Sequence, residues 1–93
     1  MNYRADAMVG LKVAPGSTPA KVGRRLAVHP EVVYILWVSG RYDLLVEIVC
    51  DDRDRFTTLL QEQIHGRDDI ASIETMTGLQ IYKNQFLLKQ DWS

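Results

Sequence analysis

Two neighbouring stretches in the middle of the chain are apolar on both of the faces that a strand would present. Residues 31–39 (EVVYILWVS) and 43–50 (DLLVEIVC) are rich in β-branched and aromatic side chains, which favour strands over helices. Residues 40–42 are all that separates them, and so short a connection implies an antiparallel hairpin. The chain is therefore expected to build a sheet with apolar side chains on two sides of its hairpin.

The segments before this hairpin predict a strand and a helix. Residues 5–14 alternate with period two, as a strand with one apolar face does, and the apolar set is Ala5, Ala7, Val9, Leu11 and Val13. Thr18 is suited to be a helix N-cap, and Pro19 suits the first helical position, which needs no N–H. We expect this helix to end near residue 28, with Val22 and Leu26 one turn apart. A stripe of small residues is expected to face inward beside them: Ala20, Gly23 and Ala27.

The segments after the hairpin predict a second helix and a last strand. Asp51 and Asp52 supply caps and negative charge for the first turn of the helix. Its apolar stripe has helical spacing and consists of Phe56, Leu59, Leu60 and Ile64, and Gly66 ends it. Residues 70–82 alternate again and predict a strand, which residues 86–88 are expected to extend or follow.

The order of these elements predicts an α+β fold of the ferredoxin-like type, βαββαβ. It is a four-stranded antiparallel sheet with two helices on one face. Large apolar side chains nevertheless lie on both sides of residues 32–38: Val33, Ile35 and Trp37 on one, Val32, Tyr34, Leu36 and Val38 on the other. Soluble monomers rarely expose so large a patch, and covering about 600 Å² of it is worth on the order of 15 kcal/mol before the costs of association. We expect the uncovered face to pack on a second copy, giving a homodimer at least.

Composition limits the remaining possibilities. The chain has 93 residues, enough for a single domain spanning 1–93. Eleven basic against twelve acidic residues argue against direct binding of nucleic acid, which normally needs a basic surface. One cysteine excludes an intrachain disulfide and a cysteine-rich zinc site. No apolar run reaches the ~20 residues of a membrane span, and the first residues do not form a signal peptide, so we expect a cytoplasmic protein without membrane contact.

The residues that most often perform chemistry have simpler interpretations here. His29 and His65 lie at the predicted ends of the two helices, where a cation is favourable. Cys50 ends a strand and has no obvious activating neighbour. Asp51, Asp52 and Asp54 lack the glycine and the last glutamate of a calcium loop. We therefore predict no catalytic residue, no metal site and no cofactor.

Taken in order, the pieces of this sequence resemble the effector-binding and oligomerisation (RAM) domain of Lrp/AsnC transcriptional regulators. The similar stretches are VGLKVAPGSTPAKVGRRLAVHPEVVYILWVSGRYDLLVEIVCDDRDRF and IASIETMTGLQIY, which include the turn 39–43 and the pair Thr75 and Thr77. The resemblance implies dimers that pair sheet to sheet, commonly four dimers in an octamer, with amino acid effectors bound between dimers near the hairpin turn. Such regulators usually carry an N-terminal helix-turn-helix domain, which is not expected in this chain. It would then be a stand-alone sensor or an excised domain, able to assemble with a full-length regulator.

The resemblance also implies which residues would hold an amino acid. Asp43 could accept a hydrogen bond from the ligand ammonium, and backbone N–H groups around Gly40 and Arg41 could hold its carboxylate. Tyr42 could contact the ligand side chain, while Thr75 and Thr77 could supply hydroxyls from a neighbouring subunit. An acidic ligand could be favoured by Arg41. On the residues themselves, an equally good interpretation is that Asp43 fixes the turn and the threonines pair across strands.

Two other functions fit the same element order. Dimeric α+β barrel enzymes, such as small monooxygenases and isomerases, share it, but they place polar or titratable residues between sheet and helices, where this chain is mostly apolar. A purely structural oligomerisation domain would differ from the sensor only in binding no small molecule.

Overall fold

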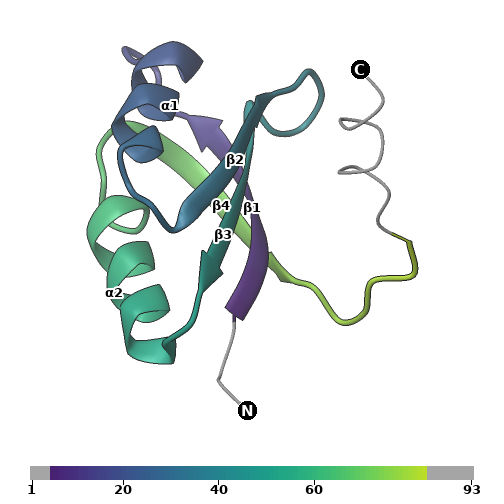
Figure 1. Ribbon diagram of the computed structural model, residues 1–93. Helices are drawn as coiled ribbons and strands as arrows, with labels where there is room; N and C mark the ends of the chain where they lie inside the picture. Colours follow the sequence, from purple (N-terminus) through teal and green to yellow (C-terminus); the bar gives the residue numbers. More distant parts are fainter. Residues whose placement is uncertain (1–4, 84–93) are drawn as a thin grey trace.

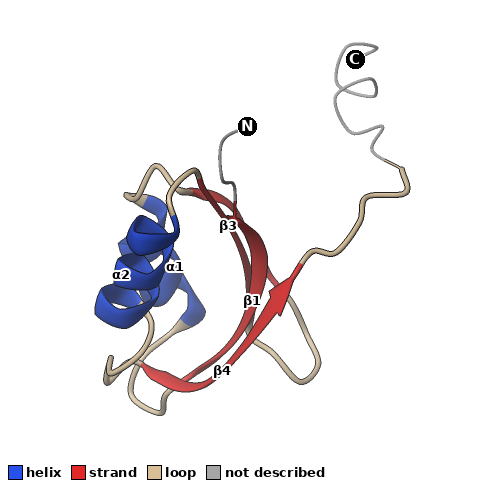
Figure 2. Ribbon diagram, turned by 90° about the horizontal axis from the view of Figure 1, so that it is seen from below, coloured by secondary structure: helices blue, strands red, loops and turns tan. Residues whose placement is uncertain are grey.

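The protein, seen in a computed structural model that describes residues 5–83, has the expected ferredoxin-like fold (Figure 1). Its elements are β1 (Ala5–Val13), α1 (Pro19–Ala27), β2 (Val32–Trp37), β3 (Leu44–Cys50), α2 (Arg53–Gln63) and β4 (Ile70–Thr77). The strands form one antiparallel sheet in the order β2-β3-β1-β4. Both helices lie on one side of this sheet, and no described helix or strand covers the other side (Figure 2). Of the described helices, neither is long and apolar enough to cross a membrane.

The helices begin where the sequence predicts them. The hydroxyl of Thr18 accepts a hydrogen bond of 3.1 Å from the N–H of Lys21, and Pro19 occupies the first turn of α1. The carboxylate of Asp52 accepts from the N–H of Asp54 at 2.9 Å and caps α2, whereas Asp51 is an exposed residue of the preceding bend. Because each cap satisfies an amide that the helix leaves without a partner, these residues define where the helices start.

The core lies between the two helices and one face of the central strands. Ala7, Val9 and Leu11 of β1 and every second residue of β3 are buried there, as the alternation predicts, and the helices contribute the apolar positions that face them. The fully buried members are Val9, Leu11, Val22, Leu26, Val46, Ile48, Leu59 and Ile64.

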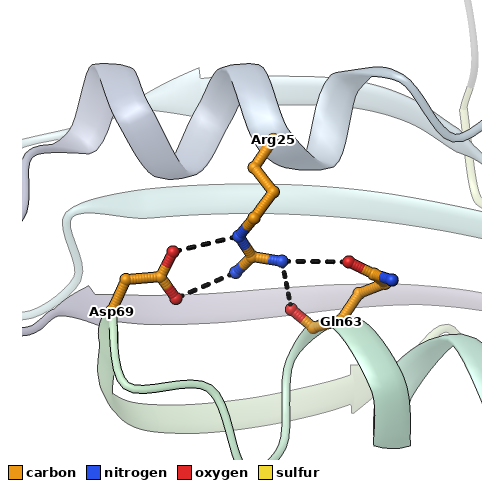
Figure 3. Close-up of polar contacts among 3 residues, drawn as sticks. All are labelled: Arg25, Gln63 and Asp69. Atoms are coloured by element: carbon orange, nitrogen blue, oxygen red, sulfur yellow. Dashed lines mark hydrogen bonds and ion pairs between the residues drawn. The ribbon is translucent and has the colours of Figure 1, made fainter.

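A clamp made by Arg25 holds the helix layer together (Figure 3). Its guanidinium donates two hydrogen bonds of 2.9 Å to the carboxylate of Asp69, in the loop before β4. Another guanidinium nitrogen donates to the backbone and side-chain oxygens of Gln63, at the end of α2, at 2.8 and 3.1 Å. Arg25 therefore connects α1 to α2 and to the start of β4 through charge-assisted contacts.

The face assignment predicted for β2 is wrong at its beginning. The register of β2 against β3 shifts between Val32 and Tyr34, so Val32 is opposite the buried Ile48 and packs on the core with Ile35. Val33, which was expected on the same side of the strand as Ile35, lies at this register shift and is exposed. A bulge inserts one residue and reverses the alternation beyond it, and the pattern of apolar residues contains no sign of it.

Two other expectations need correction. Of the small-residue stripe on α1, Gly23 packs near Ile35, but Ala20 and Ala27 are exposed along a groove between α1 and β2. The last strand ends at Thr77 rather than near residue 82. Thr77 pairs with Ala7, so β4 has by then reached the start of β1, which is its only neighbour in the described sheet. The predicted continuation at residues 86–88 lies outside the described residues.

Candidate functional site

The hairpin turn at residues 39–43 is tied to the strand beside it. The N–H of Val38 donates to the carbonyl of Asp43 at 2.9 Å and closes the hairpin, while the N–H of Asp43 donates to the carbonyl of Leu11 at 2.7 Å. Gly40 has φ +125°, a conformation that other residues rarely adopt, and the space around it is open. The turn is therefore hydrogen-bonded to β1 at its base, and residues 40 and 41 are exposed.

The carboxylate of Asp43 is half-buried, and β1 already engages it. Its Oδ2 accepts a hydrogen bond of 2.8 Å from the N–H of Val13, and its Oδ1 lies 3.8 Å from Nζ of Lys12. The N–H of Val13 lies where the register between β1 and β4 shifts, so Asp43 satisfies a donor at an irregular point of the sheet. Asp43 thus fixes the turn, and only Oδ1 faces the lysine and the surface.

Tyr42 crosses the open side of the sheet from the turn to the far edge strand. Its ring lies on Gly10 so closely that a Cβ at that position would be 2.7 Å from ring carbons Cδ1 and Cε1. Its hydroxyl donates to the carboxylate of Glu74 on β4, and the guanidinium of Arg41 lies 5.6 Å from the ring centroid. Sequence reasoning missed Gly10 and Glu74, although a glycine inside a strand is a known sign of close approach by another group.

Thr75 and Thr77 lie away from this turn within one chain. They pair with Val9 and Ala7, the residues of β1 that face the helices, so both threonines lie on the helix side of β4. Glu74, which meets Tyr42, lies on the opposite side. The structure therefore brings together Gly40, Arg41, Tyr42 and Asp43 but not the two threonines, which could reach a turn only if it belongs to a neighbouring subunit.

The open side of the sheet is apolar along β2, and charged side chains lie on the strands beside it. Tyr34 and Leu36 remain 45% and 42% exposed there, beside Leu45 of the next strand. Burial in this setting raises the pKa of Glu47 on β3, and so does the neighbouring carboxyl of Asp6 on β1, through a hydrogen bond and its charge. Negative charge is thus unfavourable at Glu47, beside the exposed apolar side chains of β2.

An ion pair and a buried thiol lie near the start of α2. The guanidinium of Arg55 donates to Glu31 at 2.7 Å and lowers the pKa of that carboxyl. Burial raises the pKa of the Cys50 thiol, which keeps it in the unreactive protonated form. Glu31, Cys50 and Arg55 all line a cavity of about 460 Å³ at the start of α2, remote from the hairpin turn. Within residues 5–83, acidic residues, histidines and the cysteine form no group of three that could hold a metal ion.

Comparison with known proteins places this geometry in a family. The family model of the Lrp/AsnC ligand binding domain matches residues 6–88, which cover all the elements described above except the first residue of β1. A search of the curated proteins found no match.

Solved structures share the fold over most of the chain. FFRP-DM1 is 27% identical with a TM-score of 0.73, and the match covers 81% of this chain and 99% of that one. AsnC of E. coli is 22% identical with a TM-score of 0.78, covering 89% of this chain and 56% of AsnC. The transcriptional regulator NMB0573 of Neisseria meningitidis, solved as its L-Met complex, is 14% identical with a TM-score of 0.74, covering 86% and 53%. This chain spans about half the length of those two regulators, and below 25% identity the likeness concerns the fold. The family match shows that the chain belongs to the Lrp/AsnC ligand-binding domains.

Proposed function

We propose that this chain is a small-molecule sensor and oligomerisation module of a transcriptional regulatory system, and that its effector is an amino acid. The observation that carries the proposal is the match of residues 6–88 to a ligand-binding domain family. That match includes a turn whose exposed backbone and half-buried carboxylate are held rigidly on β1. NMB0573, a regulator with the same fold, was solved with L-Met, which supports an amino acid as the ligand class.

The chemistry of the turn suits a zwitterion. Backbone N–H groups at residues 40 and 41 can hold a carboxylate, and Oδ1 of Asp43 can accept from an ammonium. Because Lys12 lies 3.8 Å from this oxygen, its own charge competes for Asp43 and also attracts the ligand carboxylate. The hydroxyls of Thr75 and Thr77 complete the site from a neighbouring copy in this proposal, since within one chain they lie on the other side of the sheet.

Pairing through the open side of the sheet is part of the proposed function. Two copies that meet there would cover Tyr34, Leu36 and Leu45, and further contacts between dimers would bring turns and threonines together. Octamers of four dimers, and assembly with a full-length regulator, are the larger forms that we propose. The chain itself is not expected to bind DNA, since its net charge is −1.

Calorimetry with the twenty amino acids tests the binding site. A variant at Asp43 would disturb the fold as well as the ligand, because Asp43 accepts from Val13. Thr75→Ala is cleaner, since Thr75 is exposed, and Thr57→Ala on the exposed side of α2 is its matched control. We expect Thr75→Ala to weaken the binding of the best amino acid by about tenfold, the effect of one hydrogen bond to a charged group, and Thr57→Ala to leave it unchanged. An assembled protein that binds none of the twenty would favour the purely structural role.

Sedimentation equilibrium tests the pairing. We expect at least twice the mass of one chain at micromolar concentration, and a single-chain mass for Leu36→Asp, which places a charge on the open side of the sheet. Its neighbour Trp37 pairs with the buried Leu44 and so lies on the helix side. Trp37→Asp is therefore a control from the same strand that should leave the dimer intact. A monomeric wild-type chain would contradict the proposal.

A further inference from the structure

The segment that follows β4 carries three large apolar side chains that are mostly exposed. Leu79 is 96% exposed, Ile81 69% and Tyr82 91%. The segment begins on the sheet, where the N–H of Gly78 donates to the carbonyl of Asp6 at 3.1 Å. From there residues 78–83 leave the sheet on the side away from the helices (Figure 2).

This composition is unusual for a segment surrounded by water. Single exposed apolar residues are normal on protein surfaces, but here they occupy three of four consecutive positions. Residues 78–82 contain no charged side chain that would keep the segment solvated. Within residues 5–83 the chain offers this segment no partner, because Figures 1 and 2 agree that the segment runs away from the body of the fold. A partner for the segment must therefore lie outside residues 5–83.

The open side of the sheet decides which partner this is. The segment projects from the same side of the sheet that leaves Tyr34 and Leu36 uncovered. A second copy seated on that face would stand directly in the path of the segment, and it would bring an apolar surface of the same kind. No other surface in residues 5–83 offers this continuity: the groove between α1 and β2 lies on the helix side.

We propose that residues 79–82 form an arm that packs on a second copy of this chain. The proposal rests on the pairing of copies through the open sheet face and adds to it a contact beyond the sheets. Because a pair related by a two-fold axis uses the same surfaces twice, each dimer has two such arms. Leu79 and Ile81 are the anchoring side chains, and the arm contributes to dimer affinity without contributing to the stability of the separate chain.

The dimer dissociation constant of the full chain tests the arm. We expect the double substitution of Leu79→Ser and Ile81→Ser to raise it by at least about tenfold, since each side chain would lose its burial. Gln80→Ser, between the two anchors, is the matched control and should leave it unchanged. Both variants should keep the circular dichroism spectrum of the wild type, because neither anchor belongs to the core of the fold.

Isotope-filtered NOEs in a mixed dimer give the direct measurement. We expect methyl protons of Leu79 and Ile81 in a labelled chain to show NOEs to an unlabelled chain. A wild-type dimer whose dissociation constant is unaffected by the double substitution, or whose Leu79 and Ile81 methyls show NOEs within their own chain only, would overturn the arm and leave the pairing of sheets intact. A wild-type chain that stays monomeric would instead overturn the pairing, and the arm with it.

Discussion

Replacing Gly10 with alanine should change the stability of the fold in a direction that depends on Tyr42. The new Cβ would lie 2.7 Å from two carbons of the Tyr42 ring, whereas carbon atoms in contact prefer about 3.5–4.0 Å. The ring must therefore move by roughly 1 Å, and it takes its hydroxyl away from Glu74. Crowding of this kind typically costs about 1–3 kcal/mol, offset by about 0.5–1 kcal/mol for replacing a strand glycine. We expect Gly10→Ala to lower the free energy of unfolding by about 1–2 kcal/mol.

The same substitution should stabilise a protein that lacks the ring. In a Tyr42→Ala background nothing crowds the new methyl group, so Gly10→Ala should raise the free energy of unfolding by about 0.5–1 kcal/mol. Urea unfolding of the four proteins, followed by circular dichroism at one fixed chain concentration, gives the coupling between the two positions. We expect about 1.5–3 kcal/mol of coupling. Additive effects of the two substitutions would refute the contact between ring and strand.

Three further perturbations follow from contacts in the helix layer and on the open face. Arg25→Met should lower the free energy of unfolding by about 2–4 kcal/mol, because it leaves the half-buried Asp69 carboxylate without its partner. Thermal unfolding measures this loss, and a loss below about 0.5 kcal/mol would contradict the clamp. Asp52→Ala should cost about 1 kcal/mol through the lost cap of α2, whereas Asp52→Asn should retain most of it, as the helical signal on heating reports. Burial and Asp6 raise the pKa of Glu47, so the folded state binds this proton more tightly than the unfolded state does. The contribution of Glu47 to stability should therefore fall as pH rises through the raised pKa. The Glu47→Gln variant should have a higher free energy of unfolding than the wild type above that pH and an equal one below it. Urea titrations that show no such difference between the two proteins would contradict the prediction.

The parts of the fold that the sequence predicts well are those governed by local rules. Period-two alternation in β1 identified the buried face correctly, and Thr18, Pro19 and Asp52 marked the helix starts, because capping involves residues only a few positions apart. The bulge in β2 and the early end of β4 escaped prediction for one shared reason. Each depends on where the partner strand lies, which a single strand's own residues do not specify.

The candidate site was predictable only in part for the same reason. The turn residues are adjacent in the chain, so a short motif pointed to them together. The contact of Tyr42 with Glu74 joins residues 32 positions apart, and it crosses a third strand at Gly10. Only the register of three strands brings those residues together, although the glycine inside β1 was a usable sign of it.

The irregularity at Val33 has a consequence for how the sheet can grow. β2 is an edge strand, and a straight edge offers its free amides and carbonyls to any passing strand, which is how sheets stack into ribbons and fibrils. A bulge bends the edge and breaks the even spacing of those groups. Growth of the sheet by strand addition is thereby discouraged along the β2 edge. Association through the open face, as in the pairing proposed above, does not use that edge.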